Sequence, residues 1–332
     1  MRIQNRNFKR FRFKGFAVLV LLLFLVSCSK EDSWNFKEVG TLLWIGEKHS
    51  DEAIKTAIKN TLENSSIIIA QVSWSPNDTN FFQNTDWYFN LAKDHGKSFM
   101  VNVDWQETDR SGTNGGWSFT DKKAANLFRD DIMQLIKTYN PSIINLGVEA
   151  NYYALTSEDG FKAFIGLFRE IKNKINDFDP RIKVGLSYQL ELLYGHHSGW
   201  DQVQTLRNLD VIQGDIDFLG ISTYPNMAVQ SSNNILFASN YIDSLAFRYS
   251  IPFGISETAA SSSLYNAEER MIYMKTIYEK AERLDLRFVI WGSIIDSPQS
   301  LKWSDKLGLI DNLGIPKQEL VIWQNENKKL TK

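Results

Sequence analysis

Cysteine is almost absent from this sequence, because Cys28 is the single one among 332 residues. A lone cysteine can form neither an intrachain disulfide nor a thiolate metal site, so both kinds of framework are excluded. A dinucleotide fingerprint is also missing, since the first strand-to-helix turn, Trp44–Asp51, contains no GxGxxG pattern. We therefore expect no cofactor and no bound metal.

Basic residues are scarce outside the N-terminus. Six of the 37 Lys and Arg precede residue 28, and the remaining 31 stand against 39 Asp and Glu, a net charge of about −8. Such a surface argues against nucleic acid as a partner. Hydrophobic residues make up 43% of the chain, enough for a sizeable core. Its ten tryptophans are mostly expected to fill that core, although a flat indole face also stacks on sugar rings.

Long apolar runs are lacking except at Phe16–Val26, which spans 11 residues. A membrane span needs about 20, so this run suits the apolar core of a secretory signal. It ends in Leu25-Val-Ser-Cys28, which resembles the bacterial lipobox. We therefore expect a signal peptide over 1–27, a lipid on Cys28 that binds the membrane, and a tether over 28–37. An uncleaved anchor with an incidental cysteine is the alternative.

The residues after Cys28 refine the expected location. Ser29-Lys-Glu-Asp32 resembles the acidic export tag of surface lipoproteins from Bacteroidetes-type bacteria. The resemblance implies the outer membrane or cell surface, with the periplasmic face as the alternative.

Strand-like runs alternate with helical patterns along the rest of the chain, at the spacing of βα units. The eight expected strands are Thr41–Ile45, Ile67–Trp74, Ser98–Trp105, Ile143–Glu149, Lys183–Gln189, Phe218–Tyr224, Pro252–Glu257 and Arg287–Trp291. The clearest expected helices are Asp51–Leu62, Tyr88–Asp94, Asp121–Tyr139, one opened by a capping box at Thr156, and one from Asn266 to about Leu284. The unit around Trp200–Leu209 is the least distinct.

Eight such units without a Pro- or Ser-rich linker predict one α/β domain, a (β/α)8 TIM barrel over residues 38–332. A doubly wound open sheet is the rival, and the missing dinucleotide fingerprint counts against it. No pattern indicates an oligomer, so we expect a monomer. In a barrel, catalytic groups lie at the C-terminal ends of the strands.

Glu149 and Glu257 each end an apolar strand run, the fourth and the seventh. A carboxylate there is costly to desolvate unless it has a role, although a glutamate emerging into a solvated loop is the simpler alternative. On a closed barrel both would face one mouth. Two carboxylates across a mouth suit glycoside hydrolysis, in which one donates a proton and the other attacks the anomeric carbon.

Three motifs resemble the clan A glycoside hydrolases: Gly147-Val-Glu-Ala-Asn151, Leu219-Gly-Ile-Ser-Thr-Tyr-Pro225 and Ile255-Ser-Glu-Thr-Ala259. Within the clan, the sequence is most similar to family 53, the endo-β-1,4-galactanases. The resemblance implies Glu149 as acid/base, Glu257 as nucleophile, Tyr224 as a phenol bonded to the nucleophile, and Trp291 as a floor for the sugar. Val148 departs from the clan, whose members usually place Asn before the acid/base.

Further substrate-binding candidates lie at or just beyond strand ends. They are Trp44, Trp74, Asp104, Trp105, Asn151 and Tyr188. Each has a structural alternative: the aromatic residues, with Trp117 and Trp291, could pack in the core, Asp104 could cap its loop, and Tyr224 could simply end a strand. The pair His196-His197 suggests a solvated loop rather than a metal site. The Gly-rich piece Ser111–Gly116 is interpreted as a flexible lid, because phosphate binding would require a helix N-terminus directly after it.

The sequence thus predicts a retaining glycoside hydrolase acting on a β-linked polysaccharide or oligosaccharide. A glycan-binding lipoprotein that kept the barrel and lost the chemistry is the alternative, and Val148 is the residue that favours it. A structural or adhesin-like role is a third possibility, which leaves the paired glutamates unexplained.

Overall fold

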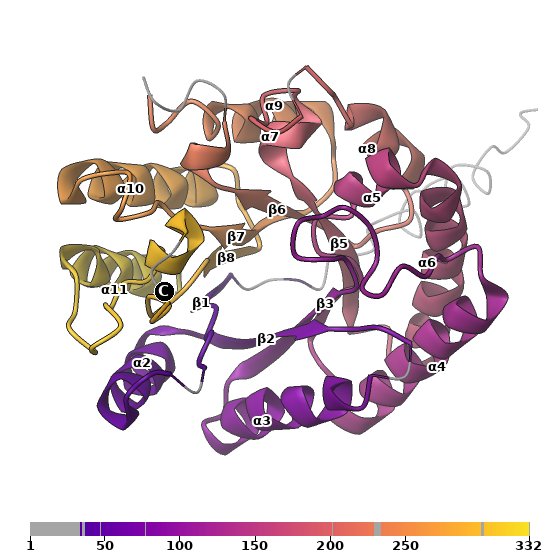
Figure 1. The fold of residues 1–332 in the computed structure, drawn as a ribbon, viewed down its shortest axis with the longest axis horizontal. Coiled ribbons are helices and arrows are strands. Elements are labelled where there is room, and N and C mark those ends of the chain that lie inside the picture. The colour runs from indigo at the N-terminus through magenta and orange to yellow at the C-terminus, as the bar shows by residue number, and fades with distance from the viewer. Residues whose placement is uncertain are drawn as a thin grey trace, which may run out of the picture. The chain divides into compact units, whose positions relative to one another are not determined.

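Eight parallel strands form one sheet in the computed structural model, in the order β1-β8-β7-β6-β5-β4-β3-β2 (Figure 1). The strands are β1 Glu38–Thr41, β2 Ile67–Ser73, β3 Ser98–Asp104, β4 Ile143–Asn145, β5 Lys183–Gln189, β6 Phe218–Thr223, β7 Phe253–Thr258 and β8 Phe288–Trp291. The sheet curls until its two ends meet, where the Ser66 N–H donates to the Val39 carbonyl at 2.9 Å. The fold is therefore a nearly closed (β/α)8 barrel, and the doubly wound sheet is excluded.

The structure describes residue 34 and residues 37–46, 48–76, 78–200, 202–228, 234–299 and 302–331. The predicted signal peptide, Cys28 and most of the predicted tether lie outside these residues. Within the described part of the chain, no helix combines the length and the apolar character needed to cross a membrane.

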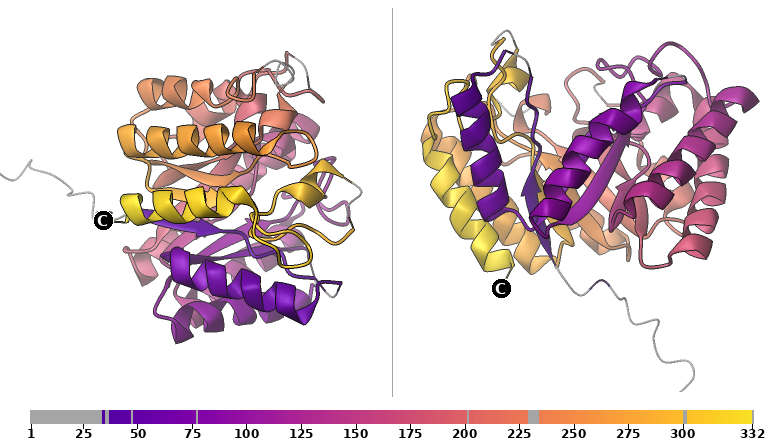
Figure 2. Two further views of the ribbon diagram at one scale, coloured as in Figure 1. Left: turned by 90° about the vertical axis from the view of Figure 1, so that its left-hand side faces the viewer. Right: turned by 90° about the horizontal axis from the view of Figure 1, so that it is seen from below.

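Helices cover the outside of the barrel (Figure 2). They are α2 Asp51–Asn64, α3 Asn80–Asp94, α4 Lys122–Tyr139, α5 Asn151–Thr156, α6 Glu158–Phe178, α7 Leu190–Leu193, α8 Leu206–Ile212, α9 Asn240–Arg248, α10 Ala267–Arg283 and α11 Gln318–Leu330. Two 3-10 turns, η1 Pro225–Met227 and η2 Trp303–Lys306, lie after β6 and β8. The expected helix near Trp200–Leu209 is α8, which begins only at Leu206.

Several predicted boundaries shift. The first strand was expected at Thr41–Ile45, but Glu38–Thr41 is the segment that pairs with β8, and the apolar Leu42 and Leu43 that suggested the later position pack beyond the strand. The capping box at Asn266 is confirmed, with reciprocal bonds to Glu269. The predicted box at Thr156 is wrong. The N-cap of α6 is Ser157, whose side chain accepts from the Gly160 N–H.

Large side chains fill the barrel interior at the N-terminal end of the strands, which leaves the opposite end for a site. Phe218 and Phe288 meet edge to face inside it, with ring centroids 5.3 Å apart. Two glycines leave room for these rings. A Cβ on Gly185 would lie 2.8 Å from the Phe218 ring, and one on Gly254 would lie 2.4 Å from the Phe288 ring. The open end is therefore the C-terminal end of the strands, where a barrel carries its functional groups.

Candidate active site

Glu149 stands four residues beyond the last paired residue of β4, at the turn into α5. Its backbone has φ of 50°, a left-handed conformation that is strained for a residue with a Cβ. The Ser187 hydroxyl of β5 accepts from its N–H at 3.1 Å. The Gln106 amide donates to its carbonyl at 3.2 Å. The turn is thus held from both sides, and strain of this kind concentrates at functional sites.

The Glu149 carboxylate is buried, with the residue 6% exposed, and both of its oxygens have partners. Arg110 Nε donates to Oε2 at 2.9 Å, and the Ser222 hydroxyl donates to Oε1 at 2.6 Å. Arg110 comes from the loop after β3, and Ser222 from β6. Two donors from separate elements, one of them a cation, thus fix the position of this carboxyl group.

Arg110 also binds Asp104 at the end of β3. Its Nη1 lies 2.8 and 2.9 Å from the two Asp104 oxygens. Burial alone would lower the pKa of Arg110, but Asp104 and Glu149 raise it, so the guanidinium stays charged. Burial raises the pKa of Asp104, and Arg110 opposes that rise. Like Glu149, Arg110 has a left-handed backbone, with φ of 61°.

Glu257 reaches the same mouth through an irregularity in β7. The register between β6 and β7 shifts so that Ile221 pairs with Ile255, whereas Ser222 pairs with Glu257. Ser256 is the extra residue, and an extra residue of this kind turns the following side chain to a new direction. The shift places Glu257 beside Ser222, the residue whose hydroxyl holds Glu149.

The Glu257 carboxyl group is buried and hydrogen-bonded to one phenol. The Tyr224 hydroxyl donates to its Oε1. Burial, followed by the charge of Glu149, raises the pKa of Glu257 to about 8, and the Tyr224 bond and Arg110 only partly oppose this. Glu257 therefore keeps its proton at neutral pH in the ligand-free protein.

Glu191 of α7 lies behind Tyr224. Its Oε1 accepts from the Thr223 hydroxyl at 2.7 Å and from the Tyr224 N–H at 3.2 Å. Burial raises the pKa of Glu191 to about 7. This carboxyl group fixes the backbone that carries the phenol, and it faces the protein interior rather than the mouth.

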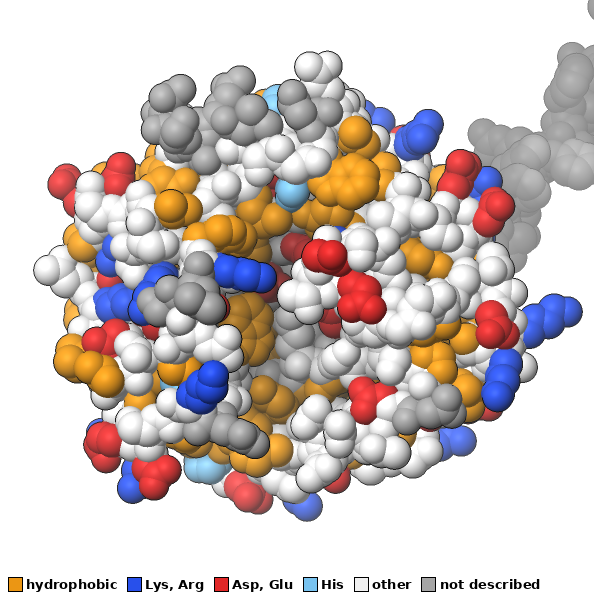
Figure 3. All heavy atoms as spheres, viewed as in Figure 1, with side chains coloured by type: hydrophobic (Ala, Val, Ile, Leu, Met, Phe, Trp, Pro, Cys, Tyr) orange, Lys and Arg blue, Asp and Glu red, His pale blue; other side chains and the backbone are white. Residues whose placement is uncertain are grey.

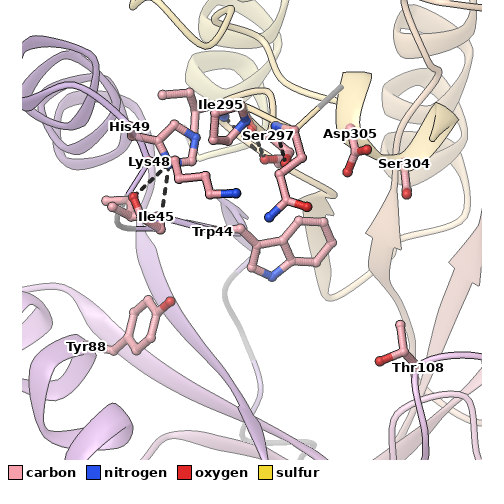
Figure 4. A pocket seen from close by; sticks show the side chains of 14 residues that line it. Trp44, Ile45, Lys48, His49, Tyr88, Thr108, Ile295, Ser297, Ser304 and Asp305 are labelled. Carbon is pink, nitrogen blue, oxygen red and sulfur yellow. Dashed lines mark hydrogen bonds between the residues drawn. The ribbon is translucent and has the colours of Figure 1, made fainter. Parts of the chain in front are cut away.

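A hollow opens on this face of the molecule, over the centre of the barrel (Figure 3). Beside the carboxylates lies a groove of about 710 Å³, lined by residues that include Trp44, Thr108 and Ser304. Thr108 belongs to the loop that carries Arg110. Ser304 follows Trp303, whose ring lies 5.6 Å from that of Tyr224. The groove therefore flanks the carboxylate pair, and the Trp44 indole lies in it (Figure 4).

Five predicted substrate contacts lie elsewhere. Trp74, Trp105, Tyr188, Trp291 and Asn151 are at most 1% exposed. The four aromatic residues belong to the layer between strands and helices: Trp74 packs on Phe128 and Trp291 faces Tyr273, for example. Asn151 binds the Gln189 backbone and Thr205. These side chains build the scaffold, and the structure removes them from the candidate site.

Three residues of the site had no assigned role in the sequence. Arg110 and Trp303 lie in loops, where no periodic pattern marks a residue. Ser222 lies within the quoted motif before Tyr224, and its alternation along β6 was the available signal. Val148 is 2% exposed and offers its carbonyl to Gln106.

The prediction of a solvated loop at His196-His197 is wrong for His197, which is 7% exposed. His197 Nε2 lies 2.7 Å from the Tyr152 hydroxyl, and burial lowers the pKa of His197. His196 stacks near Tyr241 and Phe237. The Gly-rich segment Ser111–Gly116 directly follows Arg110 in the loop after β3. Among the described residues, no cluster of three or more His, Cys, Asp or Glu could hold a metal ion.

No protein-family model matches this sequence, and no curated protein matches it. Solved structures do resemble the fold. A GH5_18 protein from Bifidobacterium longum subsp. longum is 14% identical, with a TM-score of 0.65 over 89% of this chain and 79% of that one. An exo-beta-1,4-mannosidase from Opitutaceae bacterium strain TAV5 is 15% identical, with a TM-score of 0.64 over 89% of this chain and 60% of that one.

A beta-glycosidase from Pyrococcus horikoshii is a third similar structure. It is 12% identical, with a TM-score of 0.59 over 90% of this chain and 94% of that one. At these identities the likeness establishes the (β/α)8 fold and leaves the chemistry to be argued from the site itself.

Proposed function

We propose that this protein is a retaining glycosidase acting on β-linked sugars, with Glu149 as acid/base and Glu257 as nucleophile. The observation that carries the proposal is the link through Ser222, which donates to Glu149 and stands opposite Glu257 in the strand register. Two carboxyl groups held next to each other, of which one carries a proton, are what glycoside hydrolysis requires. The names of the similar structures, mannosidase and beta-glycosidase, support the same chemistry.

The reaction would proceed in two displacements. A Glu257 oxygen bonds to the anomeric carbon as the glycosidic C–O bond breaks, and the departing oxygen takes the proton of Glu149. Glu149, now a carboxylate, then removes a proton from water, whose oxygen bonds to the same carbon and displaces Glu257. Tyr224 would hold the attacking oxygen in place, because its hydroxyl is already bonded to Glu257.

A glycan-binding protein without catalysis is the second candidate. Arg110 favours it, because its Nε already binds Oε2 of Glu149, the group that would have to protonate the leaving oxygen. Val148 favours it as well, since an apolar side chain stands where clan A enzymes usually have Asn.

The test is hydrolysis by the purified full-length protein in detergent. The substrates are β-1,4-mannan, β-1,4-glucan, β-1,4-galactan and the 4-nitrophenyl β-glycosides of the same sugars. We expect sugar release from at least one, and none from the Glu257→Gln variant. Retardation of the protein by a polysaccharide in affinity electrophoresis, without product, would favour the binding protein instead.

We further propose that the mature protein begins at Cys28 and is held by a lipid on that residue at the outer membrane or cell surface. The lipobox-like sequence supports this. Expression in a Gram-negative host with Cys28→Ala is expected to move the protein from the membrane fraction to the soluble fraction, and unchanged fractionation would count against lipidation.

A further inference from the structure

We propose a second sugar-binding site on the outer wall of the barrel, over the seam between β1 and β2, where a neutral β-linked oligosaccharide continues beyond the candidate active site. The inference rests on the proposed function for the chemistry of its ligand. It concerns a part of the molecule that contains none of the carboxylates described above.

The seam is the place where the barrel is least closed. β1 pairs only with β8 and β2 only with β3, so β1 and β2 share no strand ladder. Helices α2 and α3 stand on either side of this seam (Figure 1). Tyr88 of α3 spans its upper part, donating from its hydroxyl to the Leu43 carbonyl at 2.8 Å. Besides the backbone bond from Ser66 to Val39, side chains close the wall here.

A cavity of about 600 Å³ opens on the outer side of the seam. That volume lies within the range of about 300–1,000 Å³ common for small-molecule sites. Its lining contains no charged residue: Ile45, Ile54, Ile58, Gln71, Gln83, Asn84, Trp87 and Tyr88. The side-chain amides of Gln83 and Asn84 are exposed. Side-chain amides and aromatic rings without charge suit the hydroxyls and C–H faces of a neutral sugar, and the lack of a cation in the lining disfavours a phosphate or an acidic peptide.

This cavity adjoins the groove beside the carboxylates. Ile45 and Tyr88 line both spaces, and Figure 4 shows Tyr88 bordering the groove that contains Trp44. An oligosaccharide that lies in the groove can therefore extend past Tyr88 into the outer cavity. A single sugar bound at the carboxylates would not reach it.

Two exposed tryptophans lie along the path from the groove to the outer cavity. Trp44 is 37% exposed and Trp87 is 43% exposed, whereas Trp74, Trp105 and Trp291 are at most 1% exposed. Each indole lines a concave space, where the face of a sugar ring can cover it. Trp87 meets the ring of Tyr88 edge to face, with centroids 4.7 Å apart, which fixes its orientation. One indole lines the groove and the other lines the outer cavity, as a chain of stacked sugar units requires.

The experiment measures binding by full-length protein in detergent, with Glu257→Gln in every variant to block turnover. The probes are the β-1,4-linked hexasaccharides and disaccharides of mannose, glucose and galactose, titrated by calorimetry. We expect Trp87→Ala to weaken binding of a hexasaccharide roughly threefold to tenfold, the size of one aromatic contact, and to leave disaccharide binding unchanged. Gln83→Ala provides a second variant should Trp87→Ala fold poorly.

The matched control is Phe178→Ala, an aromatic residue that is 47% exposed at the end of α6, across the barrel. It should leave both affinities unchanged. Equal hexasaccharide affinity in Trp87→Ala and its parent, equal losses on the two chain lengths, or no hexasaccharide binding by the parent would each overturn the inference. Hydrolysis by the wild type is measured separately. Turnover without dependence on Trp87 refutes this site alone, and Trp87-dependent binding without turnover refutes the enzymatic proposal alone.

Discussion

The Nε atom of Arg110 lies 2.9 Å from Oε2 of Glu149, and the same guanidinium binds Asp104. Burial and the charge of Glu149 meanwhile raise the pKa of Glu257 to about 8, so Glu257 carries a proton in the ligand-free protein at neutral pH. A retaining reaction requires the opposite distribution, a protonated Glu149 and an ionised Glu257. We infer that substrate binding moves the proton from Glu257 to Glu149, at unchanged total protonation.

The pH dependence follows from that single proton. Because the pKa of Glu257 is raised to about 8, the pair loses its last proton as the pH rises through that value, and no acid then remains for the leaving group. We expect kcat/KM to fall on the basic side with a midpoint near pH 8. Initial rates on a 4-nitrophenyl β-glycoside between pH 5 and 10 would measure it. A rate that stays level to pH 10 would contradict the shared-proton interpretation.

Arg110→Gln should move that basic limb to higher pH. The positive charge of Arg110 lowers the pKa of Glu257, so its removal lets the pair keep a proton longer. The measurement is the same pH series, read as a midpoint rather than as a rate. Arg181→Gln is the control, because the Arg181 side chain is 84% exposed and binds Asp179, which lies two residues earlier in the chain. An unshifted midpoint in Arg110→Gln would show that this cation does not govern the pair.

Glu191→Gln should stabilise the fold at alkaline pH. Burial raises the pKa of Glu191 from 4.5 to about 7, so between those values the unfolded chain releases a proton that the folded chain retains. The free energy of unfolding therefore falls as pH rises through this window. Glutamine keeps an acceptor for Thr223 and Tyr224 without a charge. We expect a gain of roughly 1–3 kcal/mol at pH 8 and little at pH 4.5.

Urea unfolding at the two pH values measures the Glu191→Gln effect. The control is Glu279→Gln, an exposed position on α10, which should change neither value. Equal stability of Glu191→Gln and wild type at pH 8 would mean that the buried carboxyl carries no such penalty.

The barrel could be predicted from the sequence because the βα units show an apolar strand run followed by a helical pattern. Apolar runs marked seven of the strands, although the fourth ends at Asn145 rather than at Glu149, and Asn266 with Glu269 marked a helix start through reciprocal hydrogen bonds. The first strand was misplaced because Leu42 and Leu43 look more strand-like than Glu38–Thr41. Which segment pairs depends on the partner strand, here β8. The local sequence pattern of the first strand carries no information about that partner.

The sequence predicted that the two glutamates lie at the same end of the barrel. It did not predict that most of the candidate aromatic residues are buried between strands and helices. In a barrel both faces of a strand are apolar, so alternation reveals that Ile68, Val72 and Trp74 share a face without revealing which one. They share the outer face, in the core between strands and helices. Arg110 could not be identified, because its role depends on a left-handed loop conformation that no periodicity encodes.

The most direct test compares Glu149→Gln with Glu257→Gln on one aryl β-glycoside with a good leaving group, such as 2,4-dinitrophenol. If Glu257 is the nucleophile, its variant should lose at least about 10³-fold in kcat. Glu149→Gln should keep much of the first step, because this leaving group needs no proton, and added azide should speed its turnover. Normal hydrolysis by Glu257→Gln, or loss in Glu149→Gln that neither the leaving group nor azide restores, would contradict the proposed roles.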